Sequence, residues 1–477
     1  MPRHRGIGAR VAHRIPPVDL MWLLAETADS PTHVGGVMLF ERPARGRADL
    51  VANIVRTYRA ARPLPPFNLV PELLTTGLPR WRRIPAVDLD YHVRHLLLPP
   101  GASETEFLRL IEDLHEPVLD RNRPGFRVWL IEGLSDDRFA LYFKVHHSII
   151  DGMSAMLRIV ASLSPASRAR PLPPFYAVDV AARRPSHPRG LIAQLEALSR
   201  AALGEASAIG DASLGLATQA LRRLLARRGR GSQAFAAADL PLNAPLRAPR
   251  SFATLTLPLA QMRALGHAFG GTINDVAAAS VDAGLHRYLA GRGTRLSRPL
   301  VAMCPVSLRE AGDATAATMA TAIFVPLGAP GATPAQRMQQ VVAALRAGKD
   351  DIHGMSKDGA LAHAAAVLGL GAAAEFARVG RLTGHVANFV LSNIAGAREP
   401  RYLGGARLRA IYPVSALGAG IGLNVTLASH DDCMGLGFVG NRASLPDLVE
   451  LARQTRAAFA ELRAAAGVRR PSRRAAR

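Results

Sequence analysis

The sequence contains little cysteine, little lysine and few aromatic residues. Its two cysteines, Cys304 and Cys433, are too few for a disulfide scaffold or for a zinc site built from cysteine. Only three of the 59 basic residues are lysine, so arginine carries almost all of the positive charge behind the net charge of +22. A basic chain attracts phosphorylated cofactors, lipid headgroups or nucleic acid. Aromatic residues make up only 5% and form no stacking motif among the arginines, which makes nucleic acid the weakest of these partners.

The chain also lacks apolar segments that would carry it to or across a membrane. Its first 26 residues are basic but contain no apolar core of the length that a secretory signal needs. The stretch closest to a membrane span, residues 359–376, is mostly alanine and glycine, which transfer poorly to hydrocarbon, and it contains His363 and Glu375. We therefore expect a cytoplasmic protein.

The 477 residues are 49% apolar and 20% charged, which predicts folded domains with large cores. Strand and helix patterns alternate up to about residue 163 and again from residue 251. The segment between them is rich in proline, arginine and alanine, with leucines at helical spacing. We expect an N-terminal α/β domain (1–164), a helical linker (165–250), a C-terminal α/β domain (251–466) and a basic disordered tail (467–477).

The sharpest local signal is a pair of histidines in LYFKVHHSIIDGMSAM. A predicted strand over residues 138–145 precedes His146 and His147, and a predicted helix starts at Gly152. Neighbouring side chains at the end of a strand point to opposite sides, so one ring can enter a cavity while the other packs behind it. A neutral imidazole is the usual base for a hydroxyl proton near neutral pH. Asp151 can fix the loop, and Gly152 keeps the start of the helix free of a side chain.

Three other interpretations of this motif are weaker. The spacing His-x-x-x-Asp without a nearby third ligand is not an established zinc pattern, so no metal site is predicted. Two packed core histidines would be the usual explanation of an arbitrary pair, but a chance match in this strand-to-helix context is rare. Ser148 lies beside the base rather than opposite it, and no G-x-S-x-G elbow occurs, which disfavours a covalent serine mechanism.

The motif resembles the HHxxxDG active site of the coenzyme-A-dependent acyltransferase superfamily. Further stretches resemble the bacterial wax ester synthase/diacylglycerol acyltransferase family, and together they extend from about residue 16 to about residue 462. They are PVDLMWLLAETADSPTHVGGVMLF (17–40), Pro79-Arg80-Trp81 before DLDYHVRH, TINDV (272–276), PVSLR (305–309), VLSNIAG (390–396) and YPVSALGAGIGLNVTLASH (412–430).

The resemblance implies two chloramphenicol-acetyltransferase-like α/β sandwich domains joined by a helical linker, with an active-site tunnel at their interface. Acyl-CoA would enter from one face and the alcohol from the other. His147 corresponds to the base that deprotonates the acceptor hydroxyl, so that its oxygen attacks the thioester directly. His146 is then a supporting residue, and Asp151 is structural. We expect Asp151 to form an ion pair with Arg309.

Two polar pairs in the second half are further candidates for substrate binding. Asn274 and Asp275 start an apolar helix after Thr272, so they either face the substrate or begin the helix as a cap. Ser392 and Asn393 end an apolar strand, where they could donate to the tetrahedral oxyanion or form an ordinary exit from the strand.

Two glycines bear on strand packing, and one departure from the family pattern bears on activity. Gly35 and Gly36 are expected to allow close backbone approach within a strand. Where the family usually carries a Gly-Asn pair after PVSLR, this chain has Ala317 and Thr318. This departure puts a polar contact of the second domain, and full activity, in doubt.

The resemblance implies esterification of diacylglycerol, of long-chain alcohols or of both, with acyl-CoA as co-substrate and no bound cofactor. Because such alcohols are insoluble in water, we expect peripheral contact with the inner membrane or with lipid droplets. Residues 221–231 and the tail 467–477 are basic enough to hold anionic headgroups, although a solvated helix end and a disordered tail explain them equally well. The alternatives are an acyltransferase or condensation-type enzyme acting on another alcohol or amine, and a catalytically inactive lipid-binding homologue.

Overall fold

The computed structural model describes residues 13–43, 49–73, 78–167, 172–179, 236–307, 320–354 and 385–467. The chain forms two compact units. Unit 1 comprises Met1–Ala181 with Glu399–Arg409, and unit 2 comprises Ala182–Arg398 with Ala410–Arg477. Most of the predicted linker, as well as the tail, lies outside the described residues. The domain boundaries inferred from the sequence stay predictions.

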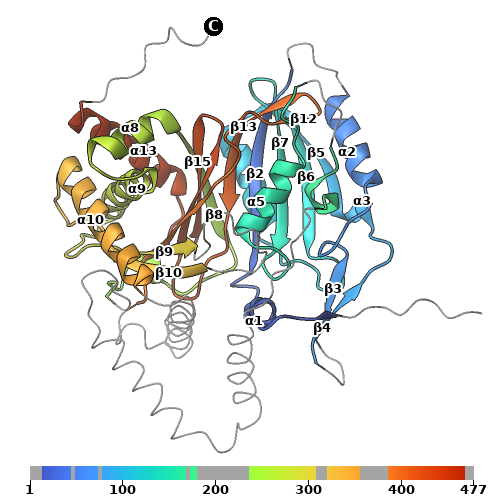
Figure 1. Cartoon of the computed structure of the whole chain (residues 1–477), viewed down its shortest axis with the longest axis horizontal. Coiled ribbons are helices and arrows are strands. Elements are labelled where there is room, and N and C mark those ends of the chain that lie inside the picture. Colours follow the sequence, from blue (N-terminus) through green and yellow to red (C-terminus); the bar gives the residue numbers. More distant parts are fainter. Residues whose placement is uncertain are drawn as a thin grey trace, which may run out of the picture. The chain divides into compact units, whose positions relative to one another are not determined.

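Unit 1 is built on a six-stranded mixed sheet with the order β12-β13-β2-β7-β6-β5 (Figure 1). β2 and β6 pair antiparallel with β7, and β5 pairs parallel with β6. The strands are β2 His33–Glu41, β5 Val93–Ala102, β6 Phe126–Leu134, β7 Arg138–His146, β12 Tyr402–Leu403 and β13 Ala406–Val414. The strand predicted over residues 138–145 is confirmed.

A small sheet and five α-helices complete the described part of unit 1. The small sheet has the order β1-β4-β3, and Ile15, Leu23 and Trp81 form an apolar cluster that packs α1 against it. The strands are β1 His13–Arg14, β3 Leu69–Glu72 and β4 Arg80–Arg83. The helices described in unit 1 are α1 Pro17–Ala25, α2 Leu50–Ala60, α3 Leu89–His92, α4 Glu104–His115 and α5 Gly152–Ala161, with a short 3-10 turn at Phe175–Ala177.

Close backbone approach at the centre of this sheet explains one of the two strand glycines. A Cβ atom at Gly35 would lie 2.3 Å from the carbonyl oxygen of Phe143 on β7, and one at Gly36 would lie 2.7 Å from the ring of the same residue. Both distances are too short for a side chain. The prediction that these glycines serve backbone approach is confirmed for Gly35, whereas Gly36 makes room for an aromatic ring.

Unit 2 contains a second six-stranded mixed sheet, with the order β10-β9-β11-β14-β15-β8. Its long helices lie together on one face of the sheet, where their apolar side chains and those of the strands form one large buried core (Figure 1). The strands are β8 Arg250–Pro258, β9 Val301–Ser307, β10 Ala320–Pro326, β11 Phe389–Ile394, β14 Leu423–His430 and β15 Cys433–Asn441. The helices are α8 Leu259–Ala268, α9 Ile273–Ala290, α10 Pro334–His353 and α13 Leu448–Ala465, preceded by a 3-10 turn at Pro241–Asn243.

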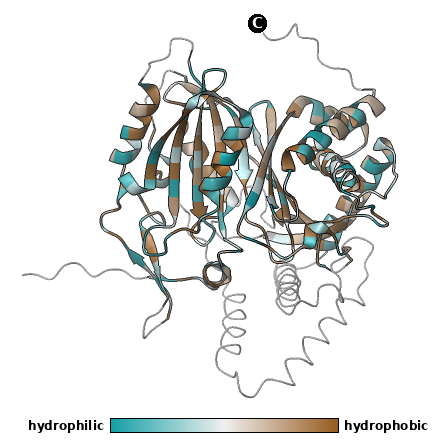
Figure 2. Ribbon diagram, turned by 180° about the vertical axis from the view of Figure 1, so that it is seen from behind, coloured by the Kyte–Doolittle hydropathy of each residue, from teal (hydrophilic) through white to brown (hydrophobic). Residues whose placement is uncertain are grey.

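The distribution of hydropathy explains why these elements pack in layers. Strands of both units are mostly apolar along their length, whereas the helices alternate apolar and polar positions (Figure 2). A helix with one apolar face covers a sheet and leaves its polar face in water. Within the described part of the chain, no helix is both long enough and apolar enough to cross a membrane. The alanine-rich stretch 359–376 lies outside that part.

Candidate active site

The histidine pair lies where strand β7 passes into helix α5, as the sequence predicts. His146 is the last residue of β7, and Gly152 is the first residue of α5. The Asp151 carboxylate accepts a hydrogen bond of 2.7 Å from the main-chain N–H of Ser154, and it thereby caps the start of α5. The structural role predicted for Asp151 therefore includes holding the end of the loop at the helix.

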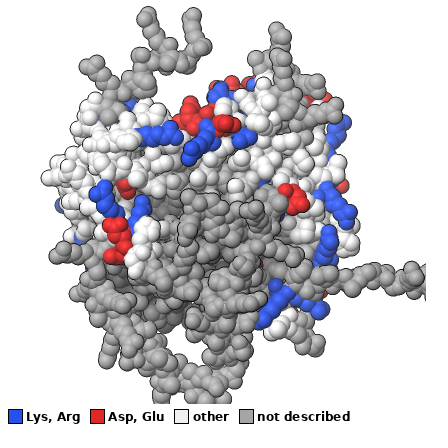
Figure 3. Space-filling view, viewed as in Figure 1, with Lys and Arg blue, Asp and Glu red and all other residues white. Residues whose placement is uncertain are grey.

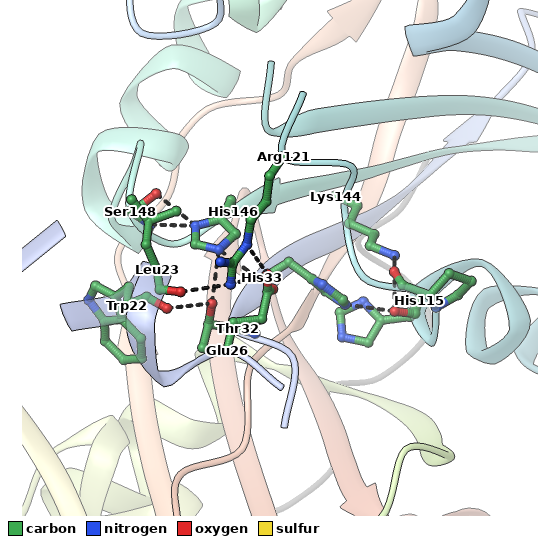
Figure 4. Close-up of polar contacts among 11 residues, drawn as sticks. Trp22, Leu23, Glu26, Thr32, His33, His115, Arg121, Lys144, His146 and Ser148 are labelled. Carbon is green, nitrogen blue, oxygen red and sulfur yellow. Dashed lines mark hydrogen bonds and ion pairs between the residues drawn. The ribbon is translucent and has the colours of Figure 1, made fainter. Parts of the chain in front are cut away.

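His146 is buried, and both of its ring nitrogens are engaged within the protein (Figure 4). The main-chain N–H of Ser148 donates to Nδ1 at 3.2 Å, so Nδ1 is an acceptor and the ring proton resides on Nε2. Nε2 lies 3.1 Å from the Thr32 hydroxyl and 3.5 Å from the Glu26 carboxylate. A ring fixed on both sides in this way supports the loop and has no free nitrogen for a substrate.

Glu26 is a buried carboxylate that the sequence analysis did not single out. Its side chain is only 4% exposed, and Arg121 forms an ion pair with it at 3.3 Å. Burial alone would raise the pKa of Glu26, but hydrogen bonds from His146 and Thr32 and the charge of Arg121 outweigh burial and lower it. Glu26 is therefore ionised at neutral pH and anchors the His146 ring.

His147 has a different environment from its neighbour. The residue is partly buried, its main-chain N–H donates to the carbonyl of Thr32 at 3.2 Å, and its ring stacks on the indole of Trp22. Burial lowers the pKa of His147, while a hydrogen bond to its own main chain and the charge of Asp151 oppose that shift. The imidazole is therefore neutral near pH 7. A neutral imidazole carries its proton on one ring nitrogen and keeps a lone pair on the other.

Helix α1 presents one face to the whole loop. Asp19, Trp22 and Glu26 follow one another at helical spacing, and they interact with Asp151, His147 and His146 respectively. Burial and the neighbouring charge of Asp151 raise the pKa of Asp19 to about 7. The spacing is visible in the sequence, but only the fold shows that this face meets the motif.

A second buried polar cluster lies behind β7. The ammonium group of Lys144 donates to the carbonyls of Leu114, His115 and Pro117 at the end of α4. His33 bonds the same His115 carbonyl at 2.6 Å (Figure 4). Burial, with help from the charge of Arg127, lowers the pKa of Lys144 to about 7. The cluster ties α4 to the strand that carries the histidine pair.

In unit 2 the structure joins two of the predicted binding residues. The Asn393 amide at the end of β11 donates to the side-chain carbonyl of Asn274 at the start of α9, at 2.6 Å. Asp275 instead accepts hydrogen bonds from the main-chain N–H and the hydroxyl of Thr272, at 2.6 and 2.9 Å, and is 4% exposed. Asp275 is thus the third residue of a capping box at the start of α9, and its role toward the substrate stays a prediction. Ser392 is partly buried on β11, and its proposed role toward the oxyanion stays a prediction.

Some predictions concern residues or groups that the structure does not test. Arg309, which we expected to pair with Asp151, and the departure at Ala317 and Thr318 lie outside the described residues. Among the residues that are described, no three His, Cys, Asp or Glu side chains gather as metal ligands would. The predictions that the protein binds no metal and no resident cofactor remain predictions.

The fold and the histidine loop define a coenzyme-A-dependent acyltransferase, and comparison with known proteins identifies its family. Residues 15–277 match the wax ester synthase/diacylglycerol acyltransferase catalytic domain, and residues 318–463 match the C-terminal domain of the same family. The chain therefore belongs to the wax ester synthase/diacylglycerol acyltransferase family, and it is an O-acyltransferase.

Individual relatives cover nearly the whole chain. A putative diacylglycerol O-acyltransferase of Mycobacterium tuberculosis is 33% identical over 490 residues, which cover 96% of this chain and 99% of the relative. The probable diacylglycerol O-acyltransferase Tgs4 of the same species is 33% identical over 470 residues, covering 96% and 98%.

Solved structures agree with this assignment. The wax ester synthase/diacylglycerol acyltransferase of Marinobacter aquaeolei VT8 superposes with a TM-score of 0.76 at 28% identity, covering 96% of this chain and 100% of that one. The first condensation domain of the CDA synthetase shares the fold, with a TM-score of 0.56 at 20% identity and coverage of 95% and 96%. The predicted α/β fold class is confirmed, whereas the predicted tunnel stays a prediction.

Proposed function

We propose that this protein transfers an acyl group from acyl-CoA to the hydroxyl of a diacylglycerol or a long-chain alcohol, with His147 as the general base. One observation carries the proposal. His147 is a partly buried residue whose ring is neutral and keeps one nitrogen lone pair, whereas both nitrogens of the adjacent His146 are engaged in the protein. The names of the relatives from Mycobacterium tuberculosis and Marinobacter aquaeolei support the choice of substrates.

In the proposed reaction the two substrates react directly. The free nitrogen of His147 takes the proton of the acceptor hydroxyl as its oxygen attacks the thioester carbonyl carbon. The tetrahedral intermediate then expels the sulfur of coenzyme A, which receives the proton from the imidazolium. One C–O bond forms and one C–S bond breaks, and the products are an ester and free coenzyme A. General-base assistance of this kind is worth about 10²- to 10⁴-fold in rate.

A covalent serine route has one apparent candidate in the structure. The Ser148 hydroxyl lies 2.7 Å from Nδ1 of His146, a distance that a nucleophile and its base would show. However, Ser148 is only 3% exposed, and its own main-chain N–H occupies the same nitrogen. Ser148 therefore supports the loop rather than attacking a substrate.

The acceptor can be identified by analysing products. We expect the purified protein, given labelled palmitoyl-CoA with diolein or hexadecanol in separate reactions, to form labelled triacylglycerol, wax ester or both. Labelled ester from neither acceptor, with a stable folded protein, would contradict the proposed substrates and favour another alcohol or amine. Bound lipid without turnover would favour the inactive lipid-binding alternative.

We further propose that the protein contacts a membrane or lipid-droplet surface through the outer face of α1. Met21 and Leu24 on this face are 55% and 68% exposed, while Leu23 on the inner face is buried against Trp81 of β4. β4 also carries Arg80, and basic side chains gather in its region at the lower right of Figure 3. Exposed apolar side chains beside arginines suit an anionic lipid surface. The basic segments predicted for this role lie outside the described residues.

Vesicle flotation tests the proposed surface. We expect the protein to float with vesicles that contain phosphatidylglycerol and to float less with phosphatidylcholine alone. The double variant Met21→Ser/Leu24→Ser should lose flotation, whereas Val449→Ser, which removes an apolar side chain that is 53% exposed on α13, should retain it. Equal flotation of all three proteins would exclude the α1 surface.

A further inference from the structure

The ring of the proposed base, His147, is covered by the indole of Trp22, to which the sequence motifs assign no individual role. The centroids of the Trp22 and His147 rings are 4.3 Å apart, and the ring planes differ by 16°. This is a stacked arrangement, in which one face of the imidazole lies against the indole. Trp22 belongs to α1, and His147 follows directly after the last residue of β7.

Thr32 fixes the two rings relative to each other. Its hydroxyl donates to the main-chain carbonyl of Trp22 at 3.2 Å, and its own carbonyl accepts from the main-chain N–H of His147 at 3.2 Å. Both stacked residues are therefore bonded through their backbones to one residue near the start of β2. The adjacent Leu23 is 2% exposed, and its carbonyl accepts from Arg121 at 2.7 Å. Hydrogen bonds to the carbonyls of Trp22 and Leu23 thus fix the main chain of α1 from which the indole extends.

The stack acts differently on the two protonation states of the imidazole. The face of an indole carries negative potential, so it attracts a cation more strongly than a neutral ring. In the proposed reaction His147 is neutral before proton transfer and becomes an imidazolium as the acceptor oxygen attacks. An interaction that strengthens between these two states accelerates the reaction rather than only tightening binding.

We propose that Trp22 is a positioning residue for His147: its indole holds the imidazole in one orientation and favours the imidazolium that forms during proton transfer. This inference rests on the proposed function, in which His147 is the base. Trp22 itself contacts neither proton nor thioester in this account, and it acts only through the ring that it covers.

Two substitutions distinguish the attraction between the indole face and the imidazolium from apolar packing over the His147 ring. Trp22→Leu keeps an apolar side chain over His147 but removes the aromatic face, whereas Trp22→Phe keeps a ring with a weaker face. Val449→Leu is the control, because Val449 is an apolar residue of α13 that is 53% exposed and belongs to neither the histidine loop nor the α1 surface. All variants are compared with the wild type in kcat, in KM for palmitoyl-CoA and for the acceptor, in the pH profile of kcat/KM, and in thermal unfolding.

We expect Trp22→Leu to lower kcat about 3- to 30-fold, the range that a cation–π contact supplies, with both KM values unchanged within about twofold. The acid limb of the pH profile should move to lower pH, because loss of the aromatic face removes support for the charged ring. Trp22→Phe should show a smaller change in the same direction, and Val449→Leu should match the wild type.

An unchanged kcat and an unmoved acid limb in a folded Trp22→Leu protein would overturn the proposal, as would a change confined to KM. If Trp22→Leu does not fold, Trp22→Phe decides the question, and an unmoved limb in that variant overturns the proposal. The His147→Ala variant, measured in parallel, separates the two claims. Turnover retained by His147→Ala would refute the proposed base itself, whereas its loss together with wild-type behaviour of Trp22→Leu would refute only the role of Trp22.

Discussion

Two adjacent histidines in this protein have different environments, and that difference underlies the roles that we propose for them. His146 donates toward Thr32 and Glu26 and accepts from Ser148, whereas the neutral His147 ring is covered on one face and keeps a lone pair on one nitrogen. Alternation at the end of a strand predicts that one ring faces inward and the other outward. It does not predict the partners of the inner ring, because Thr32 and His146 are 114 residues apart in sequence.

Replacement of His146 tests its supporting role. In His146→Ala the Glu26 carboxylate loses a hydrogen bond that lowers its pKa, although Arg121 still pairs with it. Loss of a partner from a buried polar group costs about 1–3 kcal/mol. We expect a lower melting temperature in calorimetry and reduced turnover, with the acid limb of the pH profile still present. A variant as stable and as active as the wild type would contradict this role.

At the scale of elements, α1 is the part whose role is hardest to predict from the sequence. Its residues belong to a block that resembles the family, but the block itself indicates no partner for the inner face of the helix. Helical spacing places Asp19, Trp22 and Glu26 together, yet the partner of that face comes from tertiary packing, which leaves no local signal. By contrast, the strand, loop and helix around the motif were predictable, because each has its own hydrophobic period.

The carboxyl of Asp19 makes the stability of this contact depend on pH. Its pKa is about 7 in the folded protein and near the ordinary aspartate value of 3.8 in the unfolded chain. The folded state therefore binds the proton more tightly, and the free energy of unfolding falls as pH rises from about 4 to about 7 and then levels off. We expect Asp19→Asn to flatten this slope in denaturant unfolding followed between pH 4.5 and 8. An identical slope in the variant would contradict the raised pKa.

Strand pairing at the centre of unit 1 should be sensitive to one added methyl group. In Gly35→Ala the new Cβ would lie 2.3 Å from the Phe143 carbonyl, so β2 and β7 would have to separate. Strain of this kind costs about 1–3 kcal/mol. We expect a lower melting temperature and lower activity, since β7 carries His146. Gly418→Ala is the control, because a Cβ there meets nothing within 4 Å. Equal stability of the two variants would be inconsistent with close approach at Gly35.

At the scale of the whole molecule, the alternation of strands and helices predicts two α/β sandwiches, each built on a β-sheet. The structure contains two six-stranded sheets. What it did not predict is that residues 399–409, far along the chain, belong to unit 1. The sequences of β12 and β13 are typical of ordinary strands and do not indicate which strand they join. Their place beside β2, which is distant in sequence, follows from the topology of the sheet rather than from local composition.

This topology predicts how a fragment of the chain behaves. A chain that ends at Ala181 lacks β12 and β13, so it leaves β2 as an exposed edge of its sheet. Exposed edge strands associate with other chains. We expect such a fragment to aggregate in light scattering at concentrations where the full chain does not. A monodisperse, folded fragment would show that unit 1 does not need the C-terminal segment.

The central claim is that His147 is the base of a direct acyl transfer, and release of free coenzyme A thiol tests it most directly. Purified protein is given palmitoyl-CoA with and without diolein or hexadecanol, and His147→Ala is measured beside it after its folding has been checked. The account predicts thiol release that requires an acceptor and falls by about 10²-fold or more in the variant. Release that continues at the wild-type rate in folded His147→Ala would contradict it.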